Sequence, residues 1–237
     1  MIYLGCAGWS LPREHWSEFA EQGTHLQRYA TTLPAVEINS SFYRPHQPQT
    51  YQRWAESVPA NFRFAVKMPR SITHECRLQG CEPLLDQFLF ECLHLREKLG
   101  CILVQLPPSL AYDSMTTAVF LEALRDRYPG SLAIEPRHES WRNAEPLLMD
   151  LHIARVAADP SPTTDGDQPA GWAGIQYWRL HGSPRIYHSA YELTYLQALA
   201  EKLQSAQCAA IDTWCIFDNT ASGHATHDAL VLRKLLA

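Results

Sequence analysis

Short apolar runs recur along the whole chain, and stretches with a helical spacing of apolar residues separate them. Each run is six to eight residues long and is bounded by Gly, Pro, Asp or Asn, which is typical of strands. The eight predicted strands cover residues 2–9, 35–42, 63–69, 101–107, 132–137, 154–159, 175–182 and 213–219.

Apolar residues at positions i, i+3, i+4 and i+7 predict helices between these strands. The predicted helices cover residues 26–33, 51–58, 85–99, 120–128, 196–203 and 225–236, with a less regular pattern over 144–152. Residues 160–174 are instead rich in Pro, Gly and Asp and show no helical period. We therefore predict that a loop replaces the sixth helix.

Strict alternation of strands and helices predicts parallel strands joined by right-handed crossovers. Eight strands without a change in composition favour a single domain over residues 1–237, folded as a (β/α)8 TIM-type barrel. An open, doubly wound sheet is the alternative. Its glycine-rich dinucleotide fingerprint would follow the first strand, and the sequence GCAGWSLP found there does not match it.

Polar residues occupy the carboxyl end of nearly every predicted strand. Because side chains alternate between the two faces of a strand, Glu37 and Asn39 share one face and Ile38 lies on the other. The polar strand ends found in this way are Glu37, Asn39, Lys67, Gln105, Glu135, Arg137, Asp159, Arg179, His181 and Asp218. A barrel brings these ends together at one mouth, where barrel enzymes have their active sites. The alternative, a salt-bridged plug, is disfavoured because buried ion pairs contribute little net stability.

Composition and net charge indicate which classes of binding partner to expect. Apolar residues make up 46% and charged residues 19% of the chain, as in globular proteins of enzyme size. A net charge of −5 argues against a broad basic surface, so we expect neither nucleic acid nor membrane as a partner. The seven cysteines form no CxxC pair, and no apolar leader or long apolar run is present. We expect reduced thiols and a cytoplasmic location.

Seven ordered motifs resemble the YecE-like proteins, the family called domain of unknown function 72. They are GWS, VEINSSFYRP, FRFAVKMPRSITHECRL, LGCILVQLPPS, IEPRHESW, YWRLHG and FDNTASGHA. The resemblance spans almost the entire chain and implies a TIM-type barrel of no established activity, likened to sugar isomerases at the level of fold only. Two departures stand out: Asp218-Asn219 replaces the usual Asn-Asn, and a short sixth connection predicts a lower wall on one side of the mouth.

The mixture of acidic and basic strand ends predicts acid/base chemistry on a small anionic molecule that carries a sugar or phosphate group. Burial and neighbouring cations would tune a carboxylate base, with Glu135 or Glu37 as the candidates and His181 as the complementary acid. The predicted catalytic residues are Glu37, Lys67, Glu135 and His181. The predicted substrate-binding residues are Asn39, Tyr43, Gln105, Arg137, His138, Arg179, Asp218 and Asn219. We expect no cofactor and no bound metal.

Three other interpretations stay open. A metal-dependent hydrolase or isomerase would use Glu135, Asp159, His181 and Asp218 as ligands, although three basic side chains share the same mouth. Lys67 could form an imine if it lost its proton, although Glu37 nearby would favour the charged form. A non-catalytic module would bind a ligand or nucleic acid through a basic lip made of Arg70, His74 and Arg77.

Overall fold

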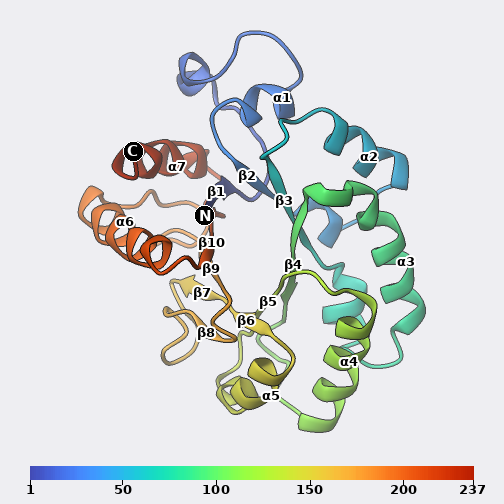
Figure 1. Cartoon of the computed structure of the whole chain (residues 1–237). Helices are drawn as coiled ribbons and strands as arrows, with labels where there is room; N and C mark the ends of the chain where they lie inside the picture. Colours follow the sequence, from blue (N-terminus) through green and yellow to red (C-terminus); the bar gives the residue numbers. More distant parts are fainter.

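The computed structural model describes all of residues 1–237, and it alternates strands with helices along the chain (Figure 1). The strands are β1 (Ile2–Cys6), β2 (Ala35–Ile38), β3 (Arg63–Lys67), β4 (Leu99–Gln105), β5 (Leu132–Glu135), β6 (Ile153–Arg155), β7 (Ala157–Asp159), β8 (Ala170–Gly171), β9 (Ile175–Leu180) and β10 (Asp212–Phe217). The helices are α1 (His25–Ala30), α2 (Pro48–Glu56), α3 (Glu82–Cys92), α4 (Ser114–Arg127), α5 (Glu145–Asp150), α6 (Leu193–Cys208) and α7 (His224–Leu235).

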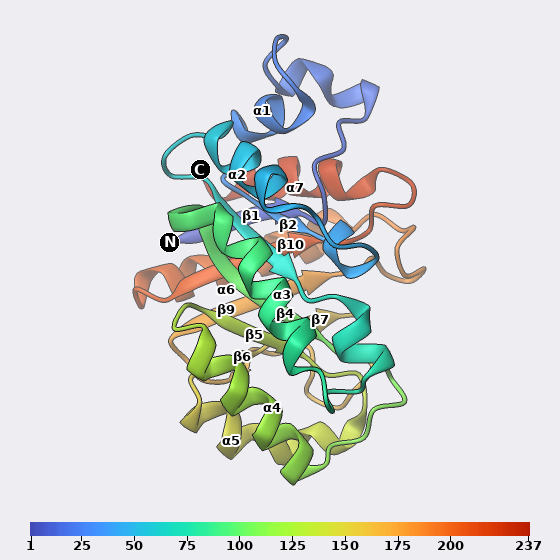
Figure 2. The same cartoon turned by 90° about the vertical axis from the view of Figure 1, so that its right-hand side faces the viewer.

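The predicted strands and helices are confirmed, although most strands end earlier than their apolar runs. Strand β2, for example, ends at Ile38, and Asn39 already belongs to the turn that leads into a short 3-10 helix, η2 (Ser40–Phe42). The helices lie on the outer side of the strands in two perpendicular views (Figures 1 and 2). No helix is both long enough and apolar enough to cross a membrane.

The strands form two sheets whose edges meet in two places. One sheet has the order β2-β3-β4-β5-β6-β8 and the other β1-β10-β9-β7, with every pair parallel except β6 and β8. A parallel bridge between Ala7 and Glu37 links the two sheets behind β1. On the opposite side, Val156 alone separates β6 from β7, which pair with β5 and β9. The result is a barrel-like arrangement in which the predicted sixth strand is split between the sheets.

The predicted loop between the sixth and seventh strands contains no helix. Residues 160–174 form only the two-residue strand β8, which runs antiparallel to β6. The backbone N–H of Gly171 donates to Glu145 on α5 at 2.6 Å and fixes this loop against that helix.

Two apolar layers lie on opposite faces of the strands. Ile38, Val66 and Ile134 belong to the large cluster between strands and helices. The inner cluster combines small side chains, such as Ala35, Ala65 and Ala133, with the large rings of Tyr177 and Trp214, which stack with their centroids 5.9 Å apart. Small residues on several strands leave the room that two large rings need. This apolar layer is the floor beneath the polar strand ends.

Candidate active site

Arg179 on β9 is the centre of the polar cluster, and it contacts three carboxylates from three other strands. Its Nε and Nη2 donate to the two oxygens of Glu37 at 2.9 and 2.7 Å, and its Nη1 donates to Glu135 at 2.8 Å. Its Nη2 also lies 3.0 Å from Asp218 Oδ2. Tyr177, two residues earlier on the same face of β9, donates its hydroxyl to Glu37 at 2.9 Å. The whole Arg179 side chain is buried.

A second line of contacts runs from Asp218 through His181 to Glu135. Asp218 Oδ2 lies 3.1 Å from His181 Nδ1, and His181 Nε2 lies 3.1 Å from Glu135 Oε1. The same Nε2 lies 3.1 Å from Nη2 of Arg137. A carboxylate can only accept and a guanidinium can only donate, so a protonated Nε2 suits Glu135 and a bare Nε2 suits Arg137. The direction of these two contacts therefore depends on the tautomer of His181.

Neighbouring cations keep the two buried carboxylates of this line ionised. Burial alone would raise the pKa of Glu135, but Arg179, Arg137 and His181 reverse that effect and hold it well below its usual range. Burial opposes ionisation of Asp218 in the same way, and Arg179 and His181 again leave its pKa lowered. Both groups are therefore anions at neutral pH, and Glu135 by itself is a weaker base than an ordinary glutamate.

Lys67 at the end of β3 differs from every other ion of the cluster. Only 6% of the residue is exposed, and its ammonium makes no hydrogen bond or ion pair. Instead, Nζ lies 4.2 Å from the centre of the Phe42 ring, a cation–π contact. Burial, followed by the positive charge of Arg179, lowers the pKa of Lys67 to about 8 despite the nearby carboxylates. Lys67 is thus a buried cation whose ammonium can still form hydrogen bonds and an ion pair.

The remaining predicted site residues lie at different depths around this cluster. Arg137 donates to Glu135 at 2.5 Å, and its buried Nε has no partner. Asn39 also has a buried oxygen, Oδ1, without a partner, whereas Gln105 donates to the carbonyl of Leu106 at 2.6 Å. Tyr43 is 69% exposed and packs edge-on against Phe42. All four residues lie at or just after the carboxyl ends of β2, β4 and β5, and Tyr43 is the most exposed of them.

Two other predicted substrate-binding residues contact the loops beside the cluster, and Asn219 Oδ1 is buried without a partner. Asn219 is fully buried, and its amide donates to Asp228 at 2.7 Å and to the carbonyl of Ser189 at 2.9 Å. His138 caps a 3-10 helix, η5 (Glu139–Ala144), through Nδ1, which accepts from the backbone N–H of Ser140 at 3.2 Å. These contacts fix the loops after β10 and β5.

Sequence reasoning missed two aromatic groups and a helix beside the cluster, and it placed Tyr177 on the face of Arg179 without giving it a role. Phe42 lies against Lys67, Tyr177 closes the floor, and Tyr187 packs edge-on against His181 with the ring centres 5.8 Å apart. A π-helix, η3 (Ser71–Glu75), carries His74 against Phe42. Such helices are rare and often mark functional sites, but five residues give no sequence signal for one.

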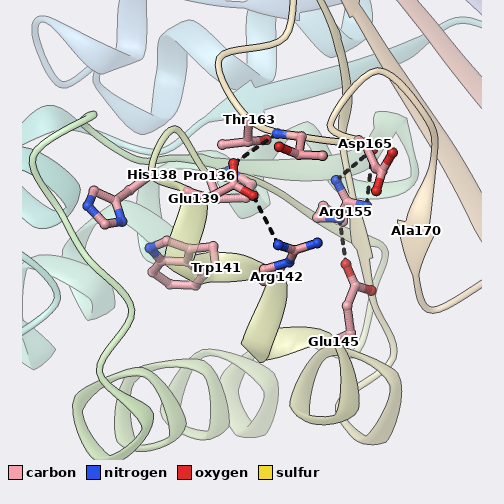
Figure 3. A pocket seen from close by; sticks show the side chains of 11 residues that line it. Pro136, His138, Glu139, Trp141, Arg142, Glu145, Arg155, Thr163, Asp165 and Ala170 are labelled. Carbon is pink, nitrogen blue, oxygen red and sulfur yellow. Dashed lines mark hydrogen bonds and ion pairs between the residues drawn. The ribbon is translucent and has the colours of Figure 1, made fainter.

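The surface near the cluster contains cavities. A cavity of about 310 Å³ lies between η5 and the loop 160–174, next to His138 (Figure 3). Its charged side chains bind one another: Arg155 donates to Glu145 at 2.5 Å, and Arg142 lies 3.5 Å from Glu139. Another cavity of about 280 Å³ lies between α3 and the turn at Phe42 and Tyr43. Lys67, Glu135, Arg137 and His181 line neither of these cavities.

The ligands proposed for a divalent metal do not fit one. The Asp159 carboxylate accepts from Tyr191 at 3.0 Å, whereas Glu135 and Asp218 bind Arg179. No group of three or more His, Cys, Asp or Glu side chains is arranged to hold a metal ion. The donor set is neutralised by arginine, which makes it a poor match for a cation.

Comparison with known proteins identifies the family. The family described as "Protein of unknown function DUF72" matches residues 3–237. This chain belongs to the DUF72 family. The resemblance seen in its motifs is thereby confirmed, and the family description names no activity.

This chain is similar to two curated proteins in sequence and to solved DUF72 structures in fold. "UPF0759 protein YecE" of Escherichia coli K12 is 29% identical over 170 residues, a match that covers 68% of this chain and 60% of that protein. "UPF0759 protein YunF" of Bacillus subtilis 168 is 24% identical over 100% of this chain and 95% of its own length. A crystal structure of a DUF72 family protein from Enterococcus faecalis V583 has a TM-score of 0.82 at 23% identity, covering 100% of this chain and 95% of its own. One from Thermotoga maritima MSB8 has a TM-score of 0.78 at 25% identity, with coverage of 100% and 99%.

Proposed function

We propose that this DUF72 protein is an enzyme that transfers protons on a small anionic molecule bound at the carboxyl ends of its strands. The observation that carries the proposal is Lys67, a buried cation without a partner, beside carboxylates that are already bound to Arg179. A proton donor with a pKa near the working pH is the most effective acid/base catalyst. Lys67, with its pKa of about 8, meets that condition.

The contacts favour different roles from those first predicted for three residues. Arg179 has its nitrogens bound to carboxylates, so it positions Glu37 and Glu135 rather than binding substrate. Glu135 has too low a pKa to act as a base, so it would position the imidazole of His181 through Nε2 rather than take up the proton itself. Asp218 orients the other side of the imidazole. The proposed machinery is Lys67 facing the substrate, with the Asp218–His181–Glu135 line moving the second proton.

Unsatisfied positive groups at the mouth support an anionic substrate. Arg137 has a buried Nε without a partner, and Lys67 has no counter-ion of its own. The positive charges of Lys67 and Arg137 both contribute to lowering the pKa of His74, after burial, so the three groups share one electrostatic neighbourhood. A carboxylate or phosphate would supply the missing acceptors.

We further propose that the strands form a closed (β/α)8 barrel. The Ala7–Glu37 bridge and the single residue between β6 and β7 support closure at both edges. Closure also explains how Arg179 on β9 contacts carboxylates carried by β2 and β5.

A turnover screen tests the proposal. Purified protein is incubated with a metabolite extract, and mass spectrometry follows the loss and gain of individual metabolites. We expect conversion of at least one anionic metabolite and a fall in rate of about 10²-fold or more in Lys67→Met. Lys98→Met is the matched control, because Lys98 is equally buried, at 5% exposure, but binds the carbonyl of Pro59.

Two results would contradict the proposal. One is the absence of any conversion by the wild-type protein, which would favour a binding module that uses the same cations. The other is full activity in Lys67→Met, which would remove Lys67 from the reaction. Circular dichroism of both variants establishes that a loss of rate does not reflect unfolding.

A further inference from the structure

Lys67 has the surroundings of an amine that reacts, not only of an ammonium that binds. Glu37, the carboxylate expected to hold it in the charged form, gives both oxygens to Arg179 and one of them also to Tyr177. Glu135 and Asp218 are likewise bound to Arg179. What remains beside Nζ is the face of the Phe42 ring at 4.2 Å. Glu37 therefore favours the charged form of Lys67 less strongly than the sequence predicts.

We propose that Lys67 forms an imine with the carbonyl carbon of a small anionic aldehyde or ketone. This inference rests on the proposed function and names its substrate class. The unpartnered amine would be the nucleophile, and the buried Nε of Arg137, also without a partner, would hold the carboxylate or phosphate of the same molecule.

The step balances without an added reactant. Lys67 gives one proton to a base, and its lone pair forms a bond to the carbonyl carbon. The carbonyl oxygen takes up that proton and a second one from the nitrogen and leaves as water, so that a C=N⁺ bond replaces C=O. The positive charge of the ammonium is thus retained on the iminium, where Phe42 and the carboxylates continue to stabilise it. An iminium acidifies the adjacent C–H bond, which makes it a suitable substrate for the Asp218–His181–Glu135 line.

The free amine is already present at neutral pH. Burial lowers the pKa of Lys67 from 10.5 to about 8. At pH 7 this raises the fraction of free amine roughly 10²-fold over a lysine with the ordinary value. Imine formation at a buried site offsets part of that gain, and we expect a preference of about tenfold or more for Lys67 over the other lysines.

Reductive trapping tests the inference without knowledge of the natural substrate. Wild-type protein is treated at pH 7.5 with sodium cyanoborohydride and one of three probes: pyruvate, dihydroxyacetone phosphate or uncharged acetone. Peptide mass spectrometry then locates the secondary amine on Lys67, Lys98, Lys202 or Lys234, the four lysines of the chain. We expect at least one anionic probe to modify Lys67 about tenfold more than any other lysine. Acetone should modify it less, and inorganic phosphate should slow the reaction.

Every other outcome contradicts imine formation, the anionic substrate class or the proposed function. Equal modification of all four lysines, or no adduct at Lys67, overturns imine formation. Equal trapping of acetone overturns the anionic substrate class. An adduct of the same yield in Lys67→Arg, which keeps the charge but lacks the amine, also contradicts the inference. If trapping fails but the turnover screen shows conversion that depends on Lys67, the proposed function stands without the imine. If trapping succeeds and no metabolite is converted, the proposed function fails instead.

Discussion

Removal of Arg179 is the sharpest perturbation of the cluster, because one side chain neutralises three buried carboxylates. In Arg179→Met, Glu135 keeps Arg137 at 2.5 Å and Asp218 keeps His181 at 3.1 Å. Glu37 keeps only the Tyr177 hydroxyl, so one buried carboxylate loses its counter-ion. Breaking a buried ion pair by removing one partner costs about 3–5 kcal/mol. We expect the free energy of unfolding to fall by that amount at pH 7.5, a large share of the roughly 5–15 kcal/mol of a typical domain.

The loss should depend on pH with a definite sign. Arg179 helps to lower the pKa of Glu135 and Asp218 in the folded protein. Groups with a lowered folded pKa stabilise the fold above their unfolded pKa of about 4, and this stabilisation disappears as pH falls further. The variant lacks most of this contribution at any pH. The difference between wild type and Arg179→Met should therefore be widest near neutrality and narrow below about pH 4.5.

Urea unfolding, followed by tryptophan fluorescence and far-UV circular dichroism at pH 7.5 and at about pH 3, measures both effects. Arg127→Met is the matched control, because Arg127 forms an ion pair with Asp86 at 2.7 Å on the surface. Exposed pairs contribute little, so this variant should stay close to wild type. A loss below about 1 kcal/mol in Arg179→Met, or an equal loss at both pH values, would refute the assignment of Arg179 as the central counter-ion.

Three further substitutions test separate contacts. Asp218→Asn removes a negative charge that raises the pKa of Lys67, so the midpoint of pH-dependent amine labelling at Lys67 should move below about 8; an unchanged midpoint would contradict this. Tyr177→Phe removes the hydroxyl that donates to Glu37 at 2.9 Å and should lower stability by about 1–3 kcal/mol in urea unfolding, and a neutral effect would show that this bond contributes nothing. Ala210 has a φ of 58° after α6, so Ala210→Gly should raise the thermal midpoint by about 1–4 °C, and a lower midpoint would argue against strain there.

The alternation of side chains along strands was enough to find most of the cluster. Glu37, Glu135, Arg179 and His181 were predicted to share one mouth, and the structure joins them by direct contacts. Alternation predicts which face a residue takes, and this depends only on its position in a strand. Asn219, next to Asp218, was not among the residues selected by alternation, and its amide donates to Ser189 and Asp228 away from the cluster.

The sequence does not predict which cation forms an ion pair with which carboxylate. Several cations and several carboxylates face the same space, and the choice depends on side-chain length and on the distance across the barrel. Arg179 reaches Glu37, Glu135 and Asp218, whereas Lys67 reaches none of them. The split of residues 154–159 into β6 and β7 was also hidden, because a strand that changes partners keeps the same apolar pattern.

The three anions around Arg179 belong to segments near residues 37, 135 and 218, so Arg179 can contact all three only when nearly the whole chain is in place. A partly assembled intermediate in which β9 is not yet in place would lack Arg179. It would carry uncompensated negative charges between the other strands. Fragments that contain only some of the strands are therefore expected to be unstable, because their carboxylates are neutralised only when the later strands have joined. In this protein, the residues proposed for the active site would therefore also form their mutual contacts late in folding.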